Sequence, residues 1–417
     1  MAVEYEYAVA LDLGKKHHVA SFFRTEDGEL QRTLRIQVNL AGFAGLERVL
    51  QSYSCNPADF IVGCESTGHV GETLLSRLKA RGYTIVRMNP TQVVQFRRGL
   101  GRRAKTDELD AEAMAIQLAV TDFVPERQVS ETARCLQRMT RLRLDFIEEQ
   151  GRWVNRVRAL INQIYPEVEL SLKDITKSTA LAILINYPSR KSLAEASPRK
   201  LTRIVEKASR GNKGRAYAKE LISIARSSVG LDYPWLEAEL RLVLKQLLSV
   251  LENIQSLEVE ITSLTEQLLQ ERSEELAVDE PLTLDSFPIG THLSIGTLLA
   301  EICDVDHFQS VKHLLSYFGW CPNTKESGAS KSLNPRMSHQ GNRFVRRIVW
   351  ILSIAAVRWV PEYRDYYQSR LAKGKNKMKT IVAVGRKLLS VIFAILRSGQ
   401  AYNPARYLGQ QMALETA

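Results

Sequence analysis

A leucine-rich stretch between residues 236 and 268 carries the most restrictive pattern in this chain. Its apolar residues recur at alternating intervals of four and three: Leu236, Leu240, Val243, Leu247, Val250, Ile254, Leu257, Ile261, Leu264 and Leu268. This spacing predicts one continuous helix of ~50 Å with a single apolar seam, at about 1.5 Å per residue. Such a seam must be covered, either by another helix of the same chain or by a second chain.

A second long helix is predicted from Met139 to Ile164, and Pro166 ends its pattern. The two helices can form a hairpin within the chain. A seam this regular also favours oligomerisation, so we expect a homo-oligomer, either a dimer or a tetramer. Residues 131–280 are therefore predicted to form a long-helix, coiled-coil domain.

An insert at residues 166–235 separates the two long helices. It has helix signals of its own and a basic, glycine-rich patch at residues 207–215. Such a patch can contact nucleic-acid phosphates, and it is equally typical of a solvated loop.

The first part of the chain, residues 1–130, alternates between strand and helix patterns. Strands are predicted at 5–13, 19–24, 30–38, 60–64 and 84–88, and helices at 42–53 and 70–81. Three strands in a meander, followed by alternating helices and strands, predict a mixed α/β sheet.

Four carboxylates fall near the ends of these elements. Asp12 lies near the end of the first strand, Glu65 ends the fourth, and Asp107 and Asp110 share one face of a first helical turn. Ligands bind at the carboxyl ends of strands in open α/β sheets. Clustered carboxylates repel one another unless a divalent cation lies between them, and Mg²⁺ is the usual cation beside phosphates. We therefore predict a Mg²⁺ site, although Asp107 and Asp110 alone would also simply favour the helix dipole.

A polar segment from Asn323 to Arg347 contains Ser327 next to Gly328. Glycine lets the backbone approach closely, and cations hold a phosphate, so a hydroxyl here suits attack on a phosphate. The same composition is typical of a solvated connector. Its basic residues are predicted to bind nucleic acid: Lys325, Lys331, Arg336, Arg343, Arg346 and Arg347. A second basic segment carries the same prediction: Arg97, Arg98, Arg102 and Arg103.

The charge and cysteine content restrict the partners. A net charge of +11 and a pI near 9.4 favour an acidic polymer, and nucleic acid is the leading candidate. The five cysteines are scattered without a CxxC pair, which argues against a zinc site or a disulfide framework. No apolar run reaches the ~18 residues of a membrane span, and the start lacks a signal-peptide pattern. We expect a cytoplasmic protein with no membrane contact.

Residues 281–417 are predicted to form a helical domain. Glycine turns at Gly290 and Gly296 are expected to feed a helix at 297–303, which looks like a helix-hairpin-helix element. Further helices are predicted at 342–359 and 380–396.

Three stretches resemble the Asp-Glu-Asp-Asp motifs of the RuvC-like domain in bacterial insertion-sequence transposases of the IS one-ten / IS eleven-eleven type. They are ALDLGKKHHVASF, VGCESTGHVGETL and AKTDELDAEAMA, and they hold Asp12, Glu65, Asp107 and Asp110. DNA invertases of the Piv kind are relatives of this family. The resemblance implies a ribonuclease-H-like fold that binds Mg²⁺ through these four residues, and it makes Lys105 a phosphate contact.

The C-terminal third is similar to the second domain of the same family. The similarity rests on Lys325-Glu-Ser327-Gly328 and Gly341-Asn342-Arg343, together with the two glycine turns. The tail around Arg386 looks more like the eleven-eleven branch. The family likeness implies that Ser327 is the catalytic nucleophile. It also implies a non-coding guide RNA, a bridge RNA, that pairs with the element-end and target DNA.

The predicted fold class is therefore α/β plus all-α. An N-terminal RuvC-like sheet is followed by a central coiled coil and a C-terminal helical domain. The predicted function is Mg²⁺-dependent DNA transposition through a phosphoserine intermediate, in a nucleoid-associated protein. Two alternatives remain at this point: a metal-only junction nuclease in which Ser327 is structural, and a non-catalytic DNA-binding architectural protein.

Overall fold

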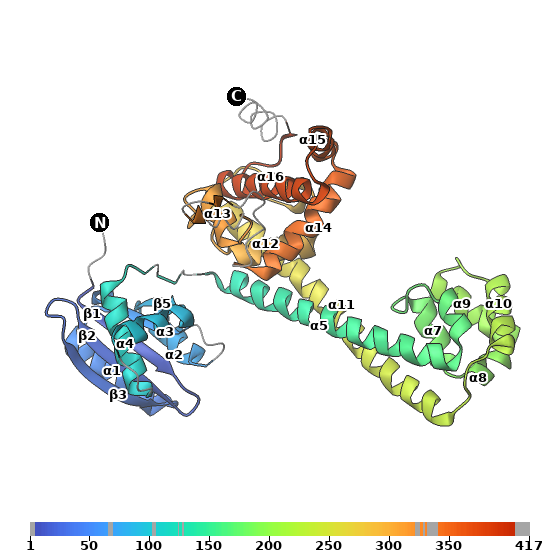
Figure 1. The fold of residues 1–417 in the computed structure, drawn as a ribbon, viewed down its shortest axis with the longest axis horizontal. Helices are drawn as coiled ribbons and strands as arrows, with labels where there is room; N and C mark the ends of the chain where they lie inside the picture. The colour runs from blue at the N-terminus through green and yellow to red at the C-terminus, as the bar shows by residue number, and fades with distance from the viewer. Residues whose placement is uncertain are drawn as a thin grey trace. The chain divides into compact units, whose positions relative to one another are not determined.

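The computed structural model describes residues 5–65, 70–101, 106–123, 125–126, 129–321 and 341–404, and the backbone of 326–327 and 330–331. The chain divides into two compact units, Met1–Gln128 and Val129–Ala417, which we describe separately (Figure 1). The further boundary predicted near residue 281 stays a prediction. No helix in the described part of the chain has the length and apolar character needed to cross a membrane.

A five-stranded mixed sheet forms the centre of the first unit, with strand order β3-β2-β1-β4-β5. The antiparallel meander consists of β1 (Tyr7–Leu13), β2 (His17–Arg24) and β3 (Leu30–Gln37). The strands β4 (Phe60–Glu65) and β5 (Thr84–Met88) then run parallel to β1. The mixed α/β sheet predicted from the sequence is confirmed.

Helices cover both faces of this sheet. One face packs against α1 (Leu40–Tyr53) and α2 (Glu72–Ala80), and the 3₁₀ turn η1 (Pro57–Asp59) leads into β4. The other face packs against α3 (Pro90–Gly99) and α4 (Asp107–Val120). Gly63 lets α4 approach the sheet closely, since a Cβ at this position would lie 2.9 Å from Leu118 Cδ2.

No helix was predicted at residues 90–99, because a proline commonly ends a local pattern. Pro90 instead occupies the first turn of this helix, where its missing N–H leaves no hydrogen bond unmade. The preceding residue, Asn89, caps the helix by accepting a hydrogen bond from the Thr91 N–H. Arg97 and Arg98 therefore belong to a helix rather than to an irregular basic segment.

Two long helices organise the second unit: α5 (Glu131–Ile164) and α11 (Pro234–Leu276). They pack against each other in antiparallel fashion, and polar contacts cross between them at three levels. The contacts are Thr132 with Glu271 at 2.6 Å, Arg143 with Glu258 at 2.5 Å, and Arg156 with Glu239 at 3.2 Å.

The apolar seam predicted in α11 is buried within the chain. Seven of its ten residues are buried, and Leu257, Leu264 and Leu268 are half-buried against the same core. The helix prediction is confirmed, but the seam does not need a second chain to cover it. Because α5 already covers the seam, the expected homo-oligomer stays a prediction without this support.

Separate hydrophobic cores occupy the two ends of the helix pair. The core at one end combines Val157–Ile164 of α5 and Leu236–Leu247 of α11 with the helical lobe, which we define as residues 166–233. The helices of the lobe are α6 (Pro166–Ser171), α7 (Ser178–Asn186), α8 (Arg190–Ala194), α9 (Pro198–Ser209) and α10 (Arg215–Ser227).

At the other end, Leu136 of α5 and Ile261 of α11 join the C-terminal core. Its elements are η2 (Leu284–Ser286), α12 (His292–Ile302), α13 (Val311–Tyr317), α14 (Arg343–Trp359), α15 (Pro361–Ala372) and α16 (Lys377–Ser398). Two short strands, β6 (Glu326–Ser327) and β7 (Ser330–Lys331), lie between α13 and α14 in sequence.

Gly296 does not form the turn that the sequence analysis predicted. The helix α12 already begins at His292, with Thr291 as its cap, so Gly296 lies inside the helix. A Cβ at this position would lie 2.2 Å from Oγ1 of the buried Thr265 in α11. Glycine is present because two helices cross closely here, and the helix-hairpin-helix prediction is not confirmed.

This close crossing gives a prediction about stability. We expect Gly296→Ala to lower the free energy of unfolding by about 1–3 kcal/mol, because its Cβ overpacks the contact with Thr265. Gly151→Ala in α5 is the matched control, since nothing lies within 4 Å of its Cβ position. That change should raise the free energy of unfolding by about 0.5–1 kcal/mol through helix propensity. Urea denaturation of both variants measures this, and two stabilised variants would contradict the close crossing.

Candidate active site

Asp12 and Glu65 lie on adjacent parallel strands of the first unit. The strands β1 and β4 pair in parallel up to the residue before each carboxylate. Because side chains alternate along a strand, Asp12 shares a face with Ala10, and Glu65 shares one with Gly63. That is the face on which α4 packs. Both carboxylates are half-buried, so the two strand ends direct them toward the side of the sheet that α4 covers.

Asp107 and Asp110 stand in the first turn of α4, as predicted. Thr106 caps this helix by accepting a hydrogen bond from Leu109 N at 3.2 Å. Both carboxylates have basic partners within the unit. Asp107 Oδ2 lies 3.6 Å from His17 Nε2, and Asp110 forms an ion pair with the guanidinium of Arg97. Two of the four predicted metal ligands therefore interact with basic side chains in this structure.

The fit of a magnesium ion to the four carboxylates depends on the distances between them and on their donor atoms. Among the described residues, no three His, Cys, Asp or Glu side chains are close enough together to hold a metal ion. The donor types still fit, because carboxylate oxygens are the ligands that Mg²⁺ prefers. They come from neighbouring strand ends and from the first turn of a helix on the same sheet face. A cation that used all four would require Arg97 and His17 to release their partners.

Two other reactive side chains near these strand ends are structural. Burial raises the pKa of the Cys64 thiol to about 11, so it stays protonated at neutral pH and is not a nucleophile. Burial also lowers the pKa of His18, which favours the neutral ring that stacks on Phe43. Neither residue was predicted as a site residue.

The backbone at Ser327 is described, but its side chain is not. β6 pairs with β7 in antiparallel fashion, and Ser327 lies opposite Ser330. Residues on both sides of this segment, Trp320 and Gly341, contact the C-terminal core. Gly341 has a φ of +96°, and a Cβ there would lie 2.6 Å from Gly319 N. The backbones on the two sides of the segment therefore come together at Gly341.

Trp320 fixes the first side of this segment. Its ring is fully buried, and its indole N–H donates to the carbonyl of Val382 in α16 at 3.0 Å. Gly385 leaves room for the ring, because a Cβ there would lie 2.6 Å from Trp320 Cζ2. Gly385 therefore has a clear packing role here.

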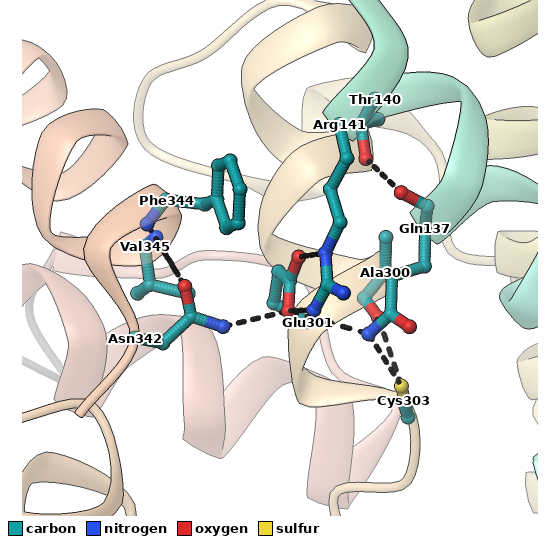
Figure 2. A network of polar contacts seen from close by, with 9 residues as sticks. All are labelled: Gln137, Thr140, Arg141, Ala300, Glu301, Cys303, Asn342, Phe344 and Val345. Carbon is teal, nitrogen blue, oxygen red and sulfur yellow. Dashed lines mark hydrogen bonds and ion pairs between the residues drawn. The ribbon is translucent and has the colours of Figure 1, made fainter. Parts of the chain in front are cut away.

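Asn342 fixes the second side through both ends of its amide (Figure 2). Its Oδ1 caps α14 by accepting from Phe344 N at 2.9 Å and Val345 N at 3.2 Å. Its Nδ2 donates to Glu301 Oε2 at 2.6 Å. The helix start and the carboxylate of Glu301 are thereby linked through one side chain.

Glu301 in α12 is the centre of this network, as Figure 2 shows. Arg141 of α5 donates to both of its oxygens, Nε to Oε1 at 2.7 Å and Nη2 to Oε2 at 2.8 Å. Gln137 adds a further bond to Oε2 at 3.2 Å. The hydrogen bond to Glu301 raises the pKa of the Arg141 guanidinium, so the guanidinium stays charged.

Glu301 was missed by the sequence analysis, although a signal was present. Glu301 is only 4% exposed, and an unpaired carboxylate at such a position is strongly unfavourable. It interrupts an apolar run in α12, and the same reasoning pointed to Asp12 in its strand. The network joins α5, α12 and α14 at one side of the segment that carries Ser327.

The basic residues predicted to bind nucleic acid differ in their surroundings. Arg98 and Arg343 are exposed. Arg97 is paired with Asp110, Arg346 donates to the Phe318 carbonyl at 3.4 Å, and Arg347 lies 3.9 Å from Glu148. The others lie outside the described residues: Arg102, Arg103, Lys105, Lys325 and Arg336, and Lys331 beyond its backbone. Their nucleic-acid contacts stay predictions.

Comparison with known proteins gives matches at both ends of the chain. Residues 9–166 match the DEDD transposase family model of IS110, and residues 285–368 match the model described as transposase IS116/IS110/IS902 family. An uncharacterized 44.8 kDa protein of insertion element IS116 from Streptomyces clavuligerus is 24% identical over 95% of this chain and 96% of its own.

Two further relatives match smaller parts. The uncharacterized 43.6 kDa protein of insertion element IS110 from Streptomyces coelicolor is 28% identical, and the match spans 64% of each chain, slightly under two thirds. The pilin gene-inverting protein of Moraxella bovis is 31% identical over 25% of this chain and 33% of its own. Since the two family models together match more than half of the residues, the chain belongs to the IS116/IS110/IS902 family of transposases.

Proposed function

We propose that this protein is a DNA transposase that cuts and rejoins strands through a covalent serine intermediate. The observation that carries the proposal is the position of Asp12 and Glu65 at neighbouring strand ends, on the sheet face whose helix begins with Asp107 and Asp110. The second family model spans Ser327, and the relative named for inverting a pilin gene supports recombination as the reaction class.

Ser327 supplies the nucleophile in this proposal. Its hydroxyl oxygen attacks a DNA phosphorus, one phosphorus–oxygen bond of the strand breaks, and the departing DNA oxygen takes up a proton. The product is a phosphodiester that joins Ser327 to the DNA. The bond that breaks is therefore replaced by a bond of the same type. A hydroxyl of another DNA end then attacks that ester, releases the serine and rejoins the strand without an external energy source.

Asp12, Glu65, Asp107 and Asp110 would hold Mg²⁺, which when bound polarises the phosphate and helps to activate the hydroxyl. Arg97 pairs with Asp110 in this structure, which offsets the charge of that one carboxylate. Magnesium as the specific ion, the eleven-eleven branch, the guide RNA, the homo-oligomer and the nucleoid location all remain predictions.

The serine intermediate gives the first test of this proposal. Protein purified with its own RNA is incubated with Mg²⁺ and labelled element-end and target DNA, then run on a denaturing protein gel. Wild type should give a labelled protein–DNA band, and Ser327→Ala should give none. Ser330→Ala is the matched control, because Ser330 is the residue that pairs with Ser327 in the neighbouring strand, and this variant should keep the band.

The other outcomes separate the alternatives. Nicked DNA from both wild type and Ser327→Ala, with no covalent band, would make the carboxylates the whole catalyst. DNA binding without cleavage, unaffected by Mg²⁺ and by Asp12→Asn, would make the protein architectural. Either result would overturn the proposed intermediate.

The Glu301 network gives a second prediction. Glu301→Gln removes the charge that holds Arg141 and Asn342, so we expect a loss of about 1–3 kcal/mol in the free energy of unfolding. The covalent band should also weaken, because Asn342 borders the segment that carries Ser327. Glu258→Gln in α11 removes a more exposed partner of Arg143, which lies on α5 as Arg141 does, and it should cost at most about 1 kcal/mol. Equal effects of the two changes on stability and band intensity would contradict a special role for Glu301.

A further inference from the structure

The helical lobe of residues 166–233 lies almost wholly outside the two regions that the family models match. It has a hydrophobic core of its own, shared with the ends of α5 and α11. Its function therefore does not follow from the matches to the transposase domains. Its surface contains a concentration of positive charge on α9 and the turn after it.

The helix α9 separates apolar and basic residues onto opposite faces. Leu201 and Val205 are buried in the lobe core. Arg199, Arg203 and Lys207 recur every four residues and are all exposed, so they form one row along the helix. The row extends over ~12 Å at about 1.5 Å per residue.

Basic residues continue through the turn and into α10. Between Pro198 and Lys219 there are eight lysines and arginines and a single acidic residue, Glu206. The eight are exposed and are named here together as the α9 surface: Arg199, Lys200, Arg203, Lys207, Arg210, Lys213, Arg215 and Lys219.

These cations lack the partners that arginines have elsewhere in the unit. On α5, Arg141, Arg143 and Arg156 each pair with a glutamate. No acidic group in the described part of the chain forms an ion pair with any member of the α9 surface. Like charges at this density repel one another within a screening length of about 8 Å, so the folded lobe favours a polyanion as counter-charge.

The surroundings favour a nucleic-acid duplex over a single strand. Proteins that bind single strands present aromatic rings on which bases stack. The one aromatic residue between positions 198 and 219 is Tyr217, whose ring is half-buried and covered by the Lys213 ammonium at 3.8 Å from the ring centre. Its hydroxyl donates to the Ser171 carbonyl at 3.1 Å, which fixes the ring on the lobe. The surface offers cations for phosphates and no ring for bases.

We propose that the α9 surface binds the phosphate backbone of a nucleic-acid duplex, independently of base sequence and of the strand-cutting reaction. Either the DNA of the element or a paired region of RNA could supply that backbone, and the shared chemistry is the regular row of phosphates. The lobe would then hold nucleic acid at the end of the helix pair opposite the C-terminal core.

The test compares two triple variants of the full-length chain that carry equal net charge. The test variant is Arg199→Glu, Arg203→Glu and Lys207→Glu. The control variant is Arg134→Glu, Arg152→Glu and Lys245→Glu, at exposed basic positions on α5 and α11 rather than on the helices of the lobe. Affinity for a fluorescent 30-base-pair DNA duplex and for an RNA hairpin is measured by anisotropy across a salt series. Working in EDTA keeps the proposed metal chemistry silent, so this inference can fail while the proposed function stands.

The expected result is a loss of affinity in the test variant for at least one probe. The slope of its plot of log affinity against log salt concentration should become less negative by about 3. Each of the three lost phosphate contacts to duplex DNA contributes about 0.9 to that slope. The control variant should keep the wild-type slope. The probe that shows the change identifies whether the backbone is DNA or RNA.

Equal slopes for the two variants with both probes would overturn the proposal, because net charge alone would then account for binding. Unfolding temperatures are recorded for both variants, since all six positions lie on the surface and should leave the fold intact. If the test variant is destabilised, a variant with glutamine at the same three positions replaces it. The expected change in slope is the same.

Discussion

The burial of the α11 seam by α5 is the interaction on which the second unit depends. Each fully buried leucine or isoleucine contributes about 1.5–3 kcal/mol relative to exposure, whereas an exposed ion pair contributes at most about 1 kcal/mol. Seven buried seam residues therefore outweigh the three polar contacts that cross the same pair. Those contacts join specific positions of α5 and α11. The apolar packing supplies most of the stability of the helix pair, and the cores at its two ends depend on that pair.

The sequence predicted α11 as one continuous helix, although shorter than the observed Pro234–Leu276, but not what covers it. A four-three repeat specifies a stripe of apolar side chains, and any complementary helix satisfies it, from the same chain or from another. The structural role of a glycine could not be read from the sequence for a similar reason. At Gly296 a residue without a Cβ fits both a turn and a close helix crossing, and only the distance to Thr265 separates the two. Local patterns describe one element, while these outcomes depend on its neighbour.

Much of the candidate site was also predictable, because strand periodicity shows where strands end. Asp12 and Glu65 were located in this way, and the parallel pairing of β1 and β4 explains why they are neighbours. The ion pair of Asp110 with Arg97 could not be found, because it required recognising α3 behind a proline. Glu301 could have been suspected as a carboxylate in an apolar helix, but its partners come from α5 and from Asn342, which are distant in sequence.

The antiparallel course of α5 and α11 makes the end of the pair that carries the helical lobe a suitable place for an inserted domain. The chain enters the lobe through one helix and leaves it through the other, and the two are already held together. A module inserted there imposes no new strain on the register below it, and its size is limited only by its own ability to form a core. A chain built on this plan can therefore exchange the outer module for another while the C-terminal core keeps its packing.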